Sequence, residues 1–287
     1  MNKYIDLIKK INIHPLFWAV TGLAIMTGYF WELLALFCIV FLHELGHAFM
    51  AHYYDWKIKR ILILPFGGYC EVDEHGNRSM QEELMVILAG PFQHLIIAIL
   101  LPILVMASVV TADYAKVILQ FNVMILIFNL LPIWPLDGGK LIQLFFATRN
   151  TYLEANRLSL VVSAVVLGML HLFIFIYSPW NINVWLVLIY LSVSLWTAWK
   201  QLRFSFMRFL MERHYGKHEY VSQLQTINAK GDEYLHEVFT KFKRGCKHLI
   251  YVAGPTHQGK LDENELLYAY FTEKRVDARL KDLVYDD

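Results

Sequence analysis

The sequence predicts a mainly α-helical polytopic membrane protein with a small α+β domain at its C-terminus. Of its 287 residues, 57% are hydrophobic and only 18% are charged, and the mean hydropathy is +0.40. A soluble domain carries about 25% charged and about 45–50% apolar residues, so this excess of apolar residues indicates contact with lipid. Charged residues are sparse from Ile11 to Trp199 and frequent from Lys200 onward. We therefore expect a membrane body followed by a water-soluble tail.

A transmembrane helix needs about 20 largely apolar residues. Six segments meet this requirement, and we expect each to cross the bilayer: residues 12–30, 31–53, 84–108, 116–136, 158–177 and 183–200. The first follows the short basic segment Met1–Lys10, as in a signal peptide, but no small-residue cleavage site follows, so we expect a retained span. The expected domains are a transmembrane domain, an interfacial or linker helix and a regulatory domain, at residues 1–200, 201–220 and 221–287.

Lysine and arginine are unevenly divided between the two sides of a six-span arrangement, in which both termini share one side. That side would hold Lys3, Lys9, Lys10, Lys57, Lys59, Arg60, Arg78, Lys140, Arg149, Arg157, Lys200, Arg203 and Arg208. The opposite side would hold only Lys116. Because these residues are enriched in cytoplasmic loops, we predict that both termini are cytoplasmic.

Net charge and cysteine content argue against two classes of site. The formal net charge is +1, so no basic field favours nucleic acid, and we predict no direct nucleic-acid partner. The three cysteines, Cys38, Cys70 and Cys246, lie far apart and form no C-x-x-C pair. Neither a disulfide framework nor a cysteine zinc site is therefore expected.

Two regions are expected to fold outside the membrane spans: the segment between the second and third spans, and the tail. The segment Lys57–Cys70 is rich in Ile and Leu and is interrupted by Pro65 and by Gly67-Gly68, which predicts a short strand and a turn at the membrane surface. An amphipathic loop without a strand is the alternative. The tail should contain a helix over residues 233–242, a strand over 248–252, a turn at Gly254-Pro255 and a second helix over 263–271.

The strongest functional signal is the His43-Glu44-Leu45-Gly46-His47 pattern in the second predicted span. Four residues of α-helix turn about 400° and rise about 6 Å, so His43 and His47 share one face and can bind one metal ion. Glu44 can act on a water molecule without being a ligand, as in other H-E-x-x-H metallohydrolases. The alternative is three polar residues with ordinary hydrogen bonds. Three ionisable residues so close together in a membrane helix favour the metal site, because their burial in lipid is costly.

A catalytic zinc ion needs three protein ligands, and Asp137 is the best candidate for the third. Before it, Pro132 and Pro135 break the fourth predicted span, and after it Gly138 and Gly139 allow backbone to come close to other groups. The alternative role for Asp137 is to cap the following helix. Three other histidines near the spans are expected to be hydrogen-bonded polar residues rather than ligands: His14, His52 and His94.

These motifs resemble those of the site-2 proteases, a family (M50) of intramembrane zinc metalloproteases. The resemblance rests on the H-E-x-x-H pattern and on Asn129–Gly139 (NLLPIWPLDGG), and extends over the membrane body, including Phe66-Gly67-Gly68 and Ala89-Gly90-Pro91.

The family resemblance implies a role for each matching position. It implies one Zn²⁺ per chain, bound by His43, His47 and Asp137, with Glu44 as the catalytic base. It further implies that Asn129 helps to hold the substrate. Pro135, Gly67 and Gly68 are predicted to contribute to substrate binding as well.

Four stretches resemble the sporulation branch of that family: LPFGGYCEVDEHGNR, NLLPIWPLDGGKL, FKRGCKHLI and LDENELLYAYF. Members of that branch release a mother-cell sigma factor from its membrane-associated form, pro-sigma-K. The resemblance implies a membrane-associated pro-sigma factor as substrate and inhibitory membrane proteins as partners. It also implies a location in the mother-cell membrane that surrounds the forespore.

The tail Val221–Asp287 resembles one CBS (cystathionine-β-synthase) module. Such modules usually work in pairs and often bind adenine nucleotides. The resemblance therefore implies a homo-oligomer and ATP binding by a regulatory domain, without assigning any nucleotide contact to a particular residue.

The sequence thus predicts an intramembrane zinc metalloprotease in which a metal-activated water cleaves the substrate. A metal or proton transporter also places His and Asp in membrane helices, but it needs no Glu directly after the first His. A catalytically inactive membrane scaffold is the third interpretation. Because a protease gains affinity by pairing with an extended peptide, we hypothesise that Ile61–Pro65 or Phe66–Tyr69 offers a strand edge to the substrate.

Overall fold

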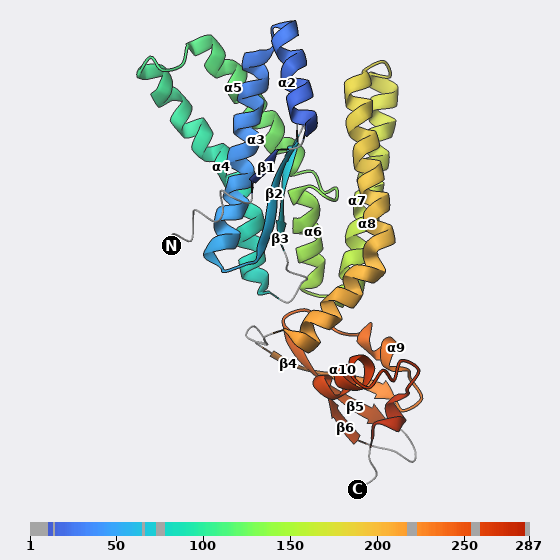
Figure 1. Ribbon diagram of the computed structural model, residues 1–287. Coiled ribbons are helices and arrows are strands. Elements are labelled where there is room, and N and C mark those ends of the chain that lie inside the picture. Colours follow the sequence, from blue (N-terminus) through green and yellow to red (C-terminus); the bar gives the residue numbers. More distant parts are fainter. Residues whose placement is uncertain are drawn as a thin grey trace. The chain divides into compact units, whose positions relative to one another are not determined.

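A computed structural model describes most of the chain as two compact units (Figure 1). The described residues are 11–13, 15–64, 67–72, 78–216, 223–253 and 259–284, with backbone alone for residues 11, 16, 17, 60–64, 67–72 and 223. One unit comprises Met1–Glu74, Gln81–Pro132 and Leu136–Gly138, and the other comprises His75–Met80, Ile133–Pro135 and Gly139–Asp287.

The first unit contains four of the predicted apolar helices. They are α2 (Pro15–Thr27), α3 (Phe30–Tyr53), α4 (Met80–Met106) and α5 (Ala112–Asn129). Helix α3 packs against both α2 and α5, and the Tyr114 hydroxyl of α5 donates a hydrogen bond of 2.6 Å to the carbonyl of Trp31 in α3. Helix α5 begins after the N-cap Thr111 and ends at Asn129. The predicted break at the two prolines is confirmed, but the helix ends before them, whereas the predicted span ran to residue 136.

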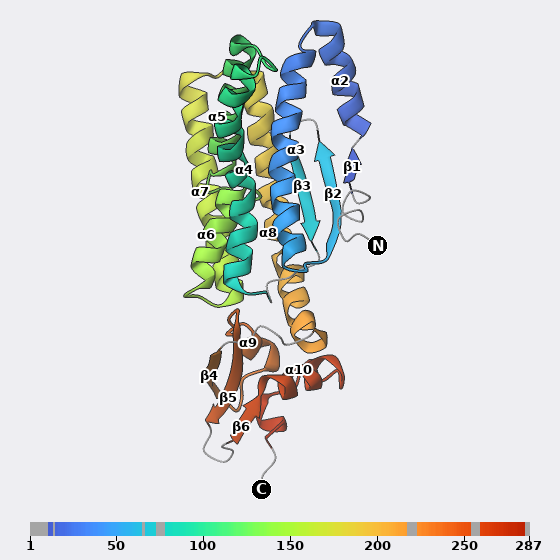
Figure 2. The same ribbon diagram turned by 90° about the vertical axis from the view of Figure 1, so that its left-hand side faces the viewer.

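A small sheet follows α3 and packs against it (Figure 2). Its central strand β2 (Ile58–Leu64) runs parallel to β1 (Ile11–Ile13) and antiparallel to β3 (Gly67–Val72). This arrangement confirms the strand expected after the second span. The turn at Pro65 lies outside the described residues.

A buried cluster joins α3 to α4 and to the sheet. Ala48 and Ala51 are fully buried on α3, and their small side chains leave room for Ile58, Val86 and the indole of Trp56. The indole nitrogen of Trp56 also donates a hydrogen bond of 3.1 Å to the Glu82 carboxylate at the start of α4. Together these contacts hold the C-terminal half of α3 beside the N-terminal half of α4.

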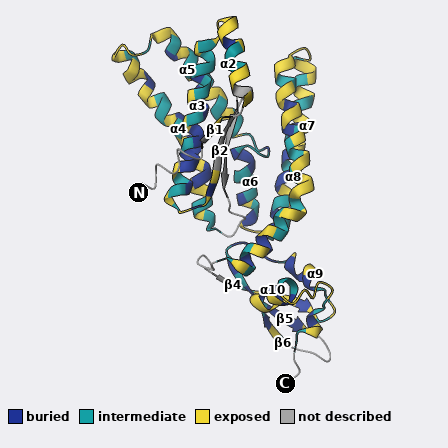
Figure 3. Ribbon diagram, viewed as in Figure 1, coloured by how far each residue is buried: buried dark blue, intermediate teal, exposed yellow. Residues whose placement is uncertain are grey.

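In the second unit, two long helices pack against one another. Helix α7 (Tyr152–Tyr177) begins with a capping box between Thr151 and Glu154, and α8 (Ile182–Tyr215) begins with an N-cap at Asn181. Much of both helices is yellow in Figure 3, the colour of exposed residues, with intermediate and buried residues between. Their exposed apolar side chains include Met169, Leu172, Phe175, Leu186, Ile189 and Val193. Water would oppose such a surface, whereas lipid accommodates it.

Within the described residues, four helices are long and apolar enough to cross a membrane: α3, α4, α7 and α8. These four match four of the six predicted spans, and they agree with a polytopic membrane protein. Helix α2 has 13 residues, or roughly 20 Å against a hydrocarbon layer of about 30 Å, and α5 has 18 residues. The predicted count of six spans therefore stays a prediction.

The C-terminal part of the second unit is a small α+β fold, as the sequence predicted. It contains β4 (Gln223–Lys230), α9 (Leu235–Phe239), β5 (Cys246–Ala253), β6 (Gly259–Asp262), α10 (Glu263–Phe271) and the 3₁₀ turn η1 (Leu280–Asp282). Strand β5 is central, parallel to β4 and antiparallel to β6. The predicted turn at Gly254-Pro255 lies outside the described residues.

Helix α8 contributes to the core of this fold. It continues without a break past residue 200, the predicted end of the transmembrane domain. Its Phe209 and Leu210 are buried with Phe239, Leu266 and Leu267. Arg213 follows on the same helix and bonds to Glu263 of α10. One helix is therefore both the last apolar segment and a core element of the tail, and the expected domain division stays a prediction.

Candidate metal centre

Helix α3 carries the H-E-x-x-H motif on its buried side. His43, Glu44 and His47 are only 3%, 8% and 7% exposed. Gly46 lies among them where α3 packs closely against α4, and a β-carbon there would lie 2.5 Å from the carbonyl oxygen of Ala89. The glycine is needed because a side chain would push the two helices apart.

Asp137 reaches the same region from a different part of the chain. It is the first residue of α6 (Asp137–Ala147) and is 3% exposed. The backbone after it packs closely against an earlier part of the chain, since a β-carbon on Gly138 would collide with the carbonyl oxygens of Leu130 and Leu131. The structure thus confirms the predicted close approach of backbone at this glycine.

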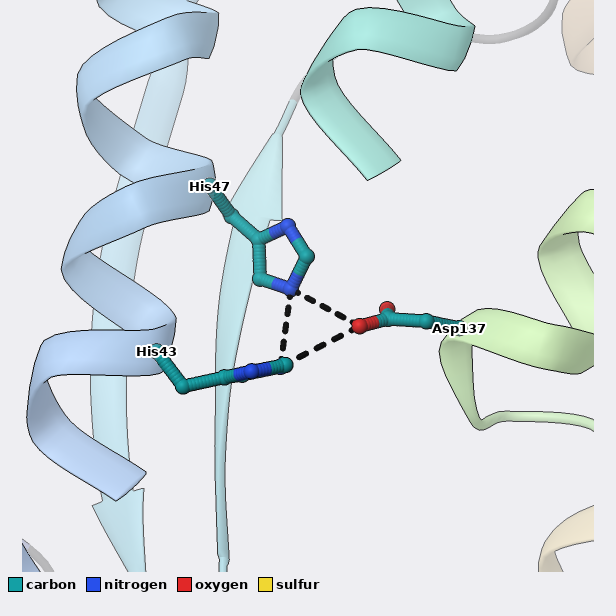
Figure 4. A group of neighbouring side chains, drawn as sticks. All are labelled: His43, His47 and Asp137. Carbon is teal, nitrogen blue, oxygen red and sulfur yellow. Dashed lines mark hydrogen bonds and ion pairs between the residues drawn. The ribbon is translucent and has the colours of Figure 1, made fainter. Parts of the chain in front are cut away.

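The three predicted ligands converge (Figure 4). The Nε2 atoms of His43 and His47 are 3.0 Å apart, and each lies 3.1 Å from the Oδ2 atom of Asp137. Asp137 therefore begins α6 and also contacts both histidines through its carboxylate. Among the described residues, these three form the one group of His, Cys, Asp and Glu side chains arranged to hold a metal ion.

The donor atoms fit a zinc ion in spacing and in chemistry. Two ligands of a tetrahedral zinc ion with bonds of about 2.0–2.1 Å lie about 3.3 Å apart, close to the observed 3.0 and 3.1 Å. The Nδ1 atom of His47 is 2.8 Å from the carbonyl oxygen of Val86, which can only accept, so neutral His47 carries its proton on Nδ1. Its Nε2 lone pair consequently points at the carboxylate, an arrangement that a cation stabilises.

Gly90 of α4 provides the space for both imidazoles. A β-carbon at this position would overlap the His47 ring and would lie 2.8 Å from Cε1 of His43. Gly90 belongs to the Ala89-Gly90-Pro91 stretch of the family resemblance, but no function was predicted for it. A signal was nevertheless present, because Val86, Gly90 and His94 recur every four residues and so share one face of a helix.

The other predicted histidines lie outside the ligand set. His94 is 1% exposed and bonds to Asn122 and to His43, which confirms the expectation of a hydrogen-bonded residue. His52 lies in the last turn of α3, away from the cluster of three ligands. His14 is outside the described residues.

The residues expected to bind substrate occupy two regions. Asn129 is the last residue of α5 and is half-buried, as is Pro135 in the segment before Asp137. Gly67 and Gly68 begin β3 and pair with the end of β2. Their predicted contacts with a substrate stay predictions, as does the catalytic role of Glu44.

Comparison with known proteins identifies relatives of this chain. Residues 31–111 and 106–173 match the model of Peptidase family M50. The chain is 41% identical over 285 residues, 99% of each chain, to Stage IV sporulation protein FB of Bacillus subtilis. It is also 31% identical over 180 residues to a zinc metalloprotease of Methanocaldococcus jannaschii, covering 61% of this chain and 51% of the relative.

A solved structure shares the architecture. The site-2 protease from Methanocaldococcus jannaschii superposes with a TM-score of 0.52 and 28% sequence identity, over 66% of this chain and 89% of that one. The residues of this chain that match the family model include His43, His47 and Asp137. The chain therefore belongs to Peptidase family M50, the site-2 proteases, and is an intramembrane zinc metalloprotease.

Proposed function

We propose that the chain cleaves a membrane-associated pro-sigma factor during sporulation and thereby releases an active transcription factor. The observation that carries the catalytic part is the convergence of two imidazoles and one carboxylate, with Glu44 beside His43 on the same helix. The biological part is supported by the 41% identity to a relative whose name places it in sporulation. The substrate proposed is pro-sigma-K.

His43, His47 and Asp137 would hold one zinc ion, the number of protein ligands typical of a catalytic zinc site. When bound, the zinc ion polarises the scissile carbonyl and makes water more acidic. Glu44 then accepts a proton from the attacking water and transfers it to the nitrogen of the leaving amine. Its burial at 8% exposure keeps bulk water from competing for this carboxylate.

The substrate must unwind locally, because the backbone hydrogen bonds of a helix shield its peptide bonds. The strand order favours β3 over β2 as the pairing partner for the unwound segment. Strand β2 is paired with β1 on one side and with β3 on the other, whereas β3 is at an edge of the described sheet. An extended peptide that adds to β3 would pass Gly67 and Gly68. We place Asn129 and Pro135 among the further substrate contacts.

The cellular setting follows from the family resemblance and the charge distribution. Both termini face the cytoplasm of the mother cell, in the membrane that surrounds the forespore, and inhibitory membrane proteins restrain the protease. The transmembrane domain covers residues 1–200, the linker helix 201–220 and the regulatory domain 221–287. That last domain is CBS-like, pairs in a homo-oligomer and binds ATP.

Co-expression with a membrane-associated pro-sigma factor tests the proposal. The parent chain should release the shorter product, whereas Glu44→Gln should retain stoichiometric zinc and release none. Asp137→Ala should lose both zinc and proteolysis. Equal processing by Glu44→Gln and the parent would rule out the catalytic role. A scaffold would show no Glu44-dependent proteolysis, and a transporter would show altered ion flux.

A further inference from the structure

His43 is connected through two buried side chains to a third helix of the same unit. Its Nδ1 atom lies 3.0 Å from Nε2 of His94 in α4, and Nδ1 of His94 lies 2.8 Å from Oδ1 of Asn122 in α5. We propose that His94 and Asn122 are positioning residues that set the tautomer and ring orientation of His43. This inference rests on the proposed zinc site.

The direction of the hydrogen bonds begins at Asn122. Its Nδ2 atom lies 2.9 Å from the main-chain carbonyl oxygen of His94. A carbonyl oxygen only accepts, so the amide nitrogen of Asn122 faces it and the amide oxygen faces the His94 ring. That oxygen in turn requires a donor, and Nδ1 of His94 therefore carries a proton.

The same reasoning assigns the next hydrogen bond. Neutral His94 with its proton on Nδ1 presents a lone pair at Nε2. The bond to His43 consequently has His43 Nδ1 as its donor. A neutral His43 protonated on Nδ1 carries its lone pair on Nε2, the atom that lies 3.1 Å from Asp137 Oδ2.

The opposite tautomer of His43 would block the site. With a proton on Nε2, His43 could donate an ordinary hydrogen bond to Asp137, and no lone pair would be available for a metal ion. His94 disfavours that state, because its own Nε2 lone pair would then face the lone pair on His43 Nδ1. His43, His94 and Asn122 are 3%, 1% and 2% exposed, so bulk water cannot readily supply a substitute donor or acceptor.

The tautomer of His47 is set by a main-chain contact instead. Its Nδ1 atom donates to the main-chain carbonyl of Val86, which no side-chain substitution at that position removes. The orientation of His43 depends instead on two side chains, so it should be the ligand that is sensitive to mutation of outer residues. Partners of metal-bound histidines commonly change metal affinity by about 10–100-fold when they are lost.

Zinc affinity in purified full-length protein tests the inference, with a competing chelator as the probe. His94→Leu should weaken zinc binding by about 10–100-fold and should change the visible spectrum of the cobalt(II)-substituted protein. His94→Gln should retain most of the affinity, because its amide oxygen can accept a hydrogen bond from His43 Nδ1. His171→Leu is the matched control, since the ring of His171 in α7 hydrogen-bonds to the Leu167 carbonyl of its own helix, and it should bind zinc like the parent.

Asn122→Leu and nitrogen NMR of ¹⁵N-histidine extend the test if His94→Leu fails to fold. Asn122→Leu should also weaken zinc binding, and the metal-free parent should show His43 protonated at Nδ1. A folded His94→Leu or Asn122→Leu protein with parental zinc affinity would overturn the positioning role, as would a metal-free His43 protonated at Nε2. A parent chain that binds no zinc would instead refute the proposed metal site, so the two failures are distinguishable.

Discussion

Gly90 of α4 lies directly against the imidazole of His47 in α3, so closely that a β-carbon at Gly90 would overlap the ring. The two helices can therefore approach at this level only because position 90 has no side chain. The same glycine adjoins His43. Gly90 therefore contributes, with Gly46, to the close packing of α3 and α4, and it leaves room for two predicted zinc ligands.

Replacing Gly90 with alanine should displace the imidazoles and reduce proteolysis by about 100-fold, the effect of a misplacement of about 1 Å at a catalytic site. Zinc content and the rate of substrate cleavage would measure this. Gly168→Ala is the control, because a β-carbon there has no atom within 4 Å. Parental activity in Gly90→Ala would show that the helices adjust without disturbing the ligands.

Gly138→Ala should displace Asp137. The added β-carbon would collide with the carbonyl oxygens of Leu130 and Leu131, and backbone cannot move aside as a flexible side chain can. We expect loss of zinc with the α-helical content unchanged, measured by metal analysis and circular dichroism. Gly22→Ala, which has open space around its β-carbon, should retain zinc. Equal zinc content in both variants would contradict this prediction.

Removing the metal ion should change the activity and stability of the parent reversibly. It should have little effect on a variant that lacks a metal ligand. A chelator should stop proteolysis and lower the unfolding temperature, and added zinc should restore both. At a free zinc concentration of about 1,000 times Kd, binding stabilises the folded state by about 4 kcal/mol. Asp137→Asn should show little response to zinc, whereas Asp113→Asn, whose carboxylate is exposed, should respond like the parent. A zinc-independent unfolding temperature in the parent would count against a structural contribution of the metal.

The buried Glu263 should make the C-terminal fold sensitive to acid. Burial alone raises the pKa of Glu263, but the hydrogen bond from His248 and the positive charge of Arg213 outweigh it, and the net pKa is below its ordinary value. The ionised carboxylate therefore stabilises the fold above the ordinary glutamate pKa of about 4.3. This contribution is lost as the pH falls from there through the lower folded-state pKa.

Glu263→Gln should destabilise the same fold by about 3–5 kcal/mol, because it leaves a buried arginine without its charged partner. Thermal unfolding of the full-length chain, followed from neutral to acidic pH, would measure the loss and its reduced pH dependence. Asp277→Asn, at an exposed position, should match the parent. An unchanged unfolding profile in Glu263→Gln would show that hydrogen bonds alone maintain the core.

Adjacent proline substitutions in β3 should separate substrate pairing from sheet stability. Successive N–H groups of an antiparallel strand point alternately toward the neighbouring strand and away from it. Of Gly68→Pro and Tyr69→Pro, one therefore removes a group facing β2 and the other removes a group facing the outer edge. The outward substitution should retain zinc but slow substrate cleavage. Parental cleavage by both variants would contradict strand addition at β3.

Local sequence patterns predicted the elements that depend on near neighbours. The four-residue spacing of His43 and His47 placed them on one helical face, and the proline and glycine residues around Asp137 predicted the break between α5 and α6. The second tail helix was predicted with its observed bounds, Glu263–Phe271. In each case the determining contacts lie within a few residues of one another.

Strands β4 and β6 were missed because their sequences carry weak signals of their own. Strand β4 (QLQTINAK) buries only Ile227 and Ala229 among the side chains that the structure describes, and β6 (GKLD) buries only Leu261. Each becomes a strand by pairing with β5, which is far more apolar. Propensity cannot reveal a strand whose stability comes from its neighbour.

The sequence by itself determined which residues can bind a metal ion, because ligand chemistry and helical spacing are local properties. Only the tertiary structure decided that Asp137 meets both histidines, that Gly90 makes room for them, and that Asn122 orients His43 through His94. Those relationships join α3 to α4, α5 and the start of α6. They arise from the packing of helices that are distant in the chain. In such packing, one added methyl group can prevent two helices from approaching.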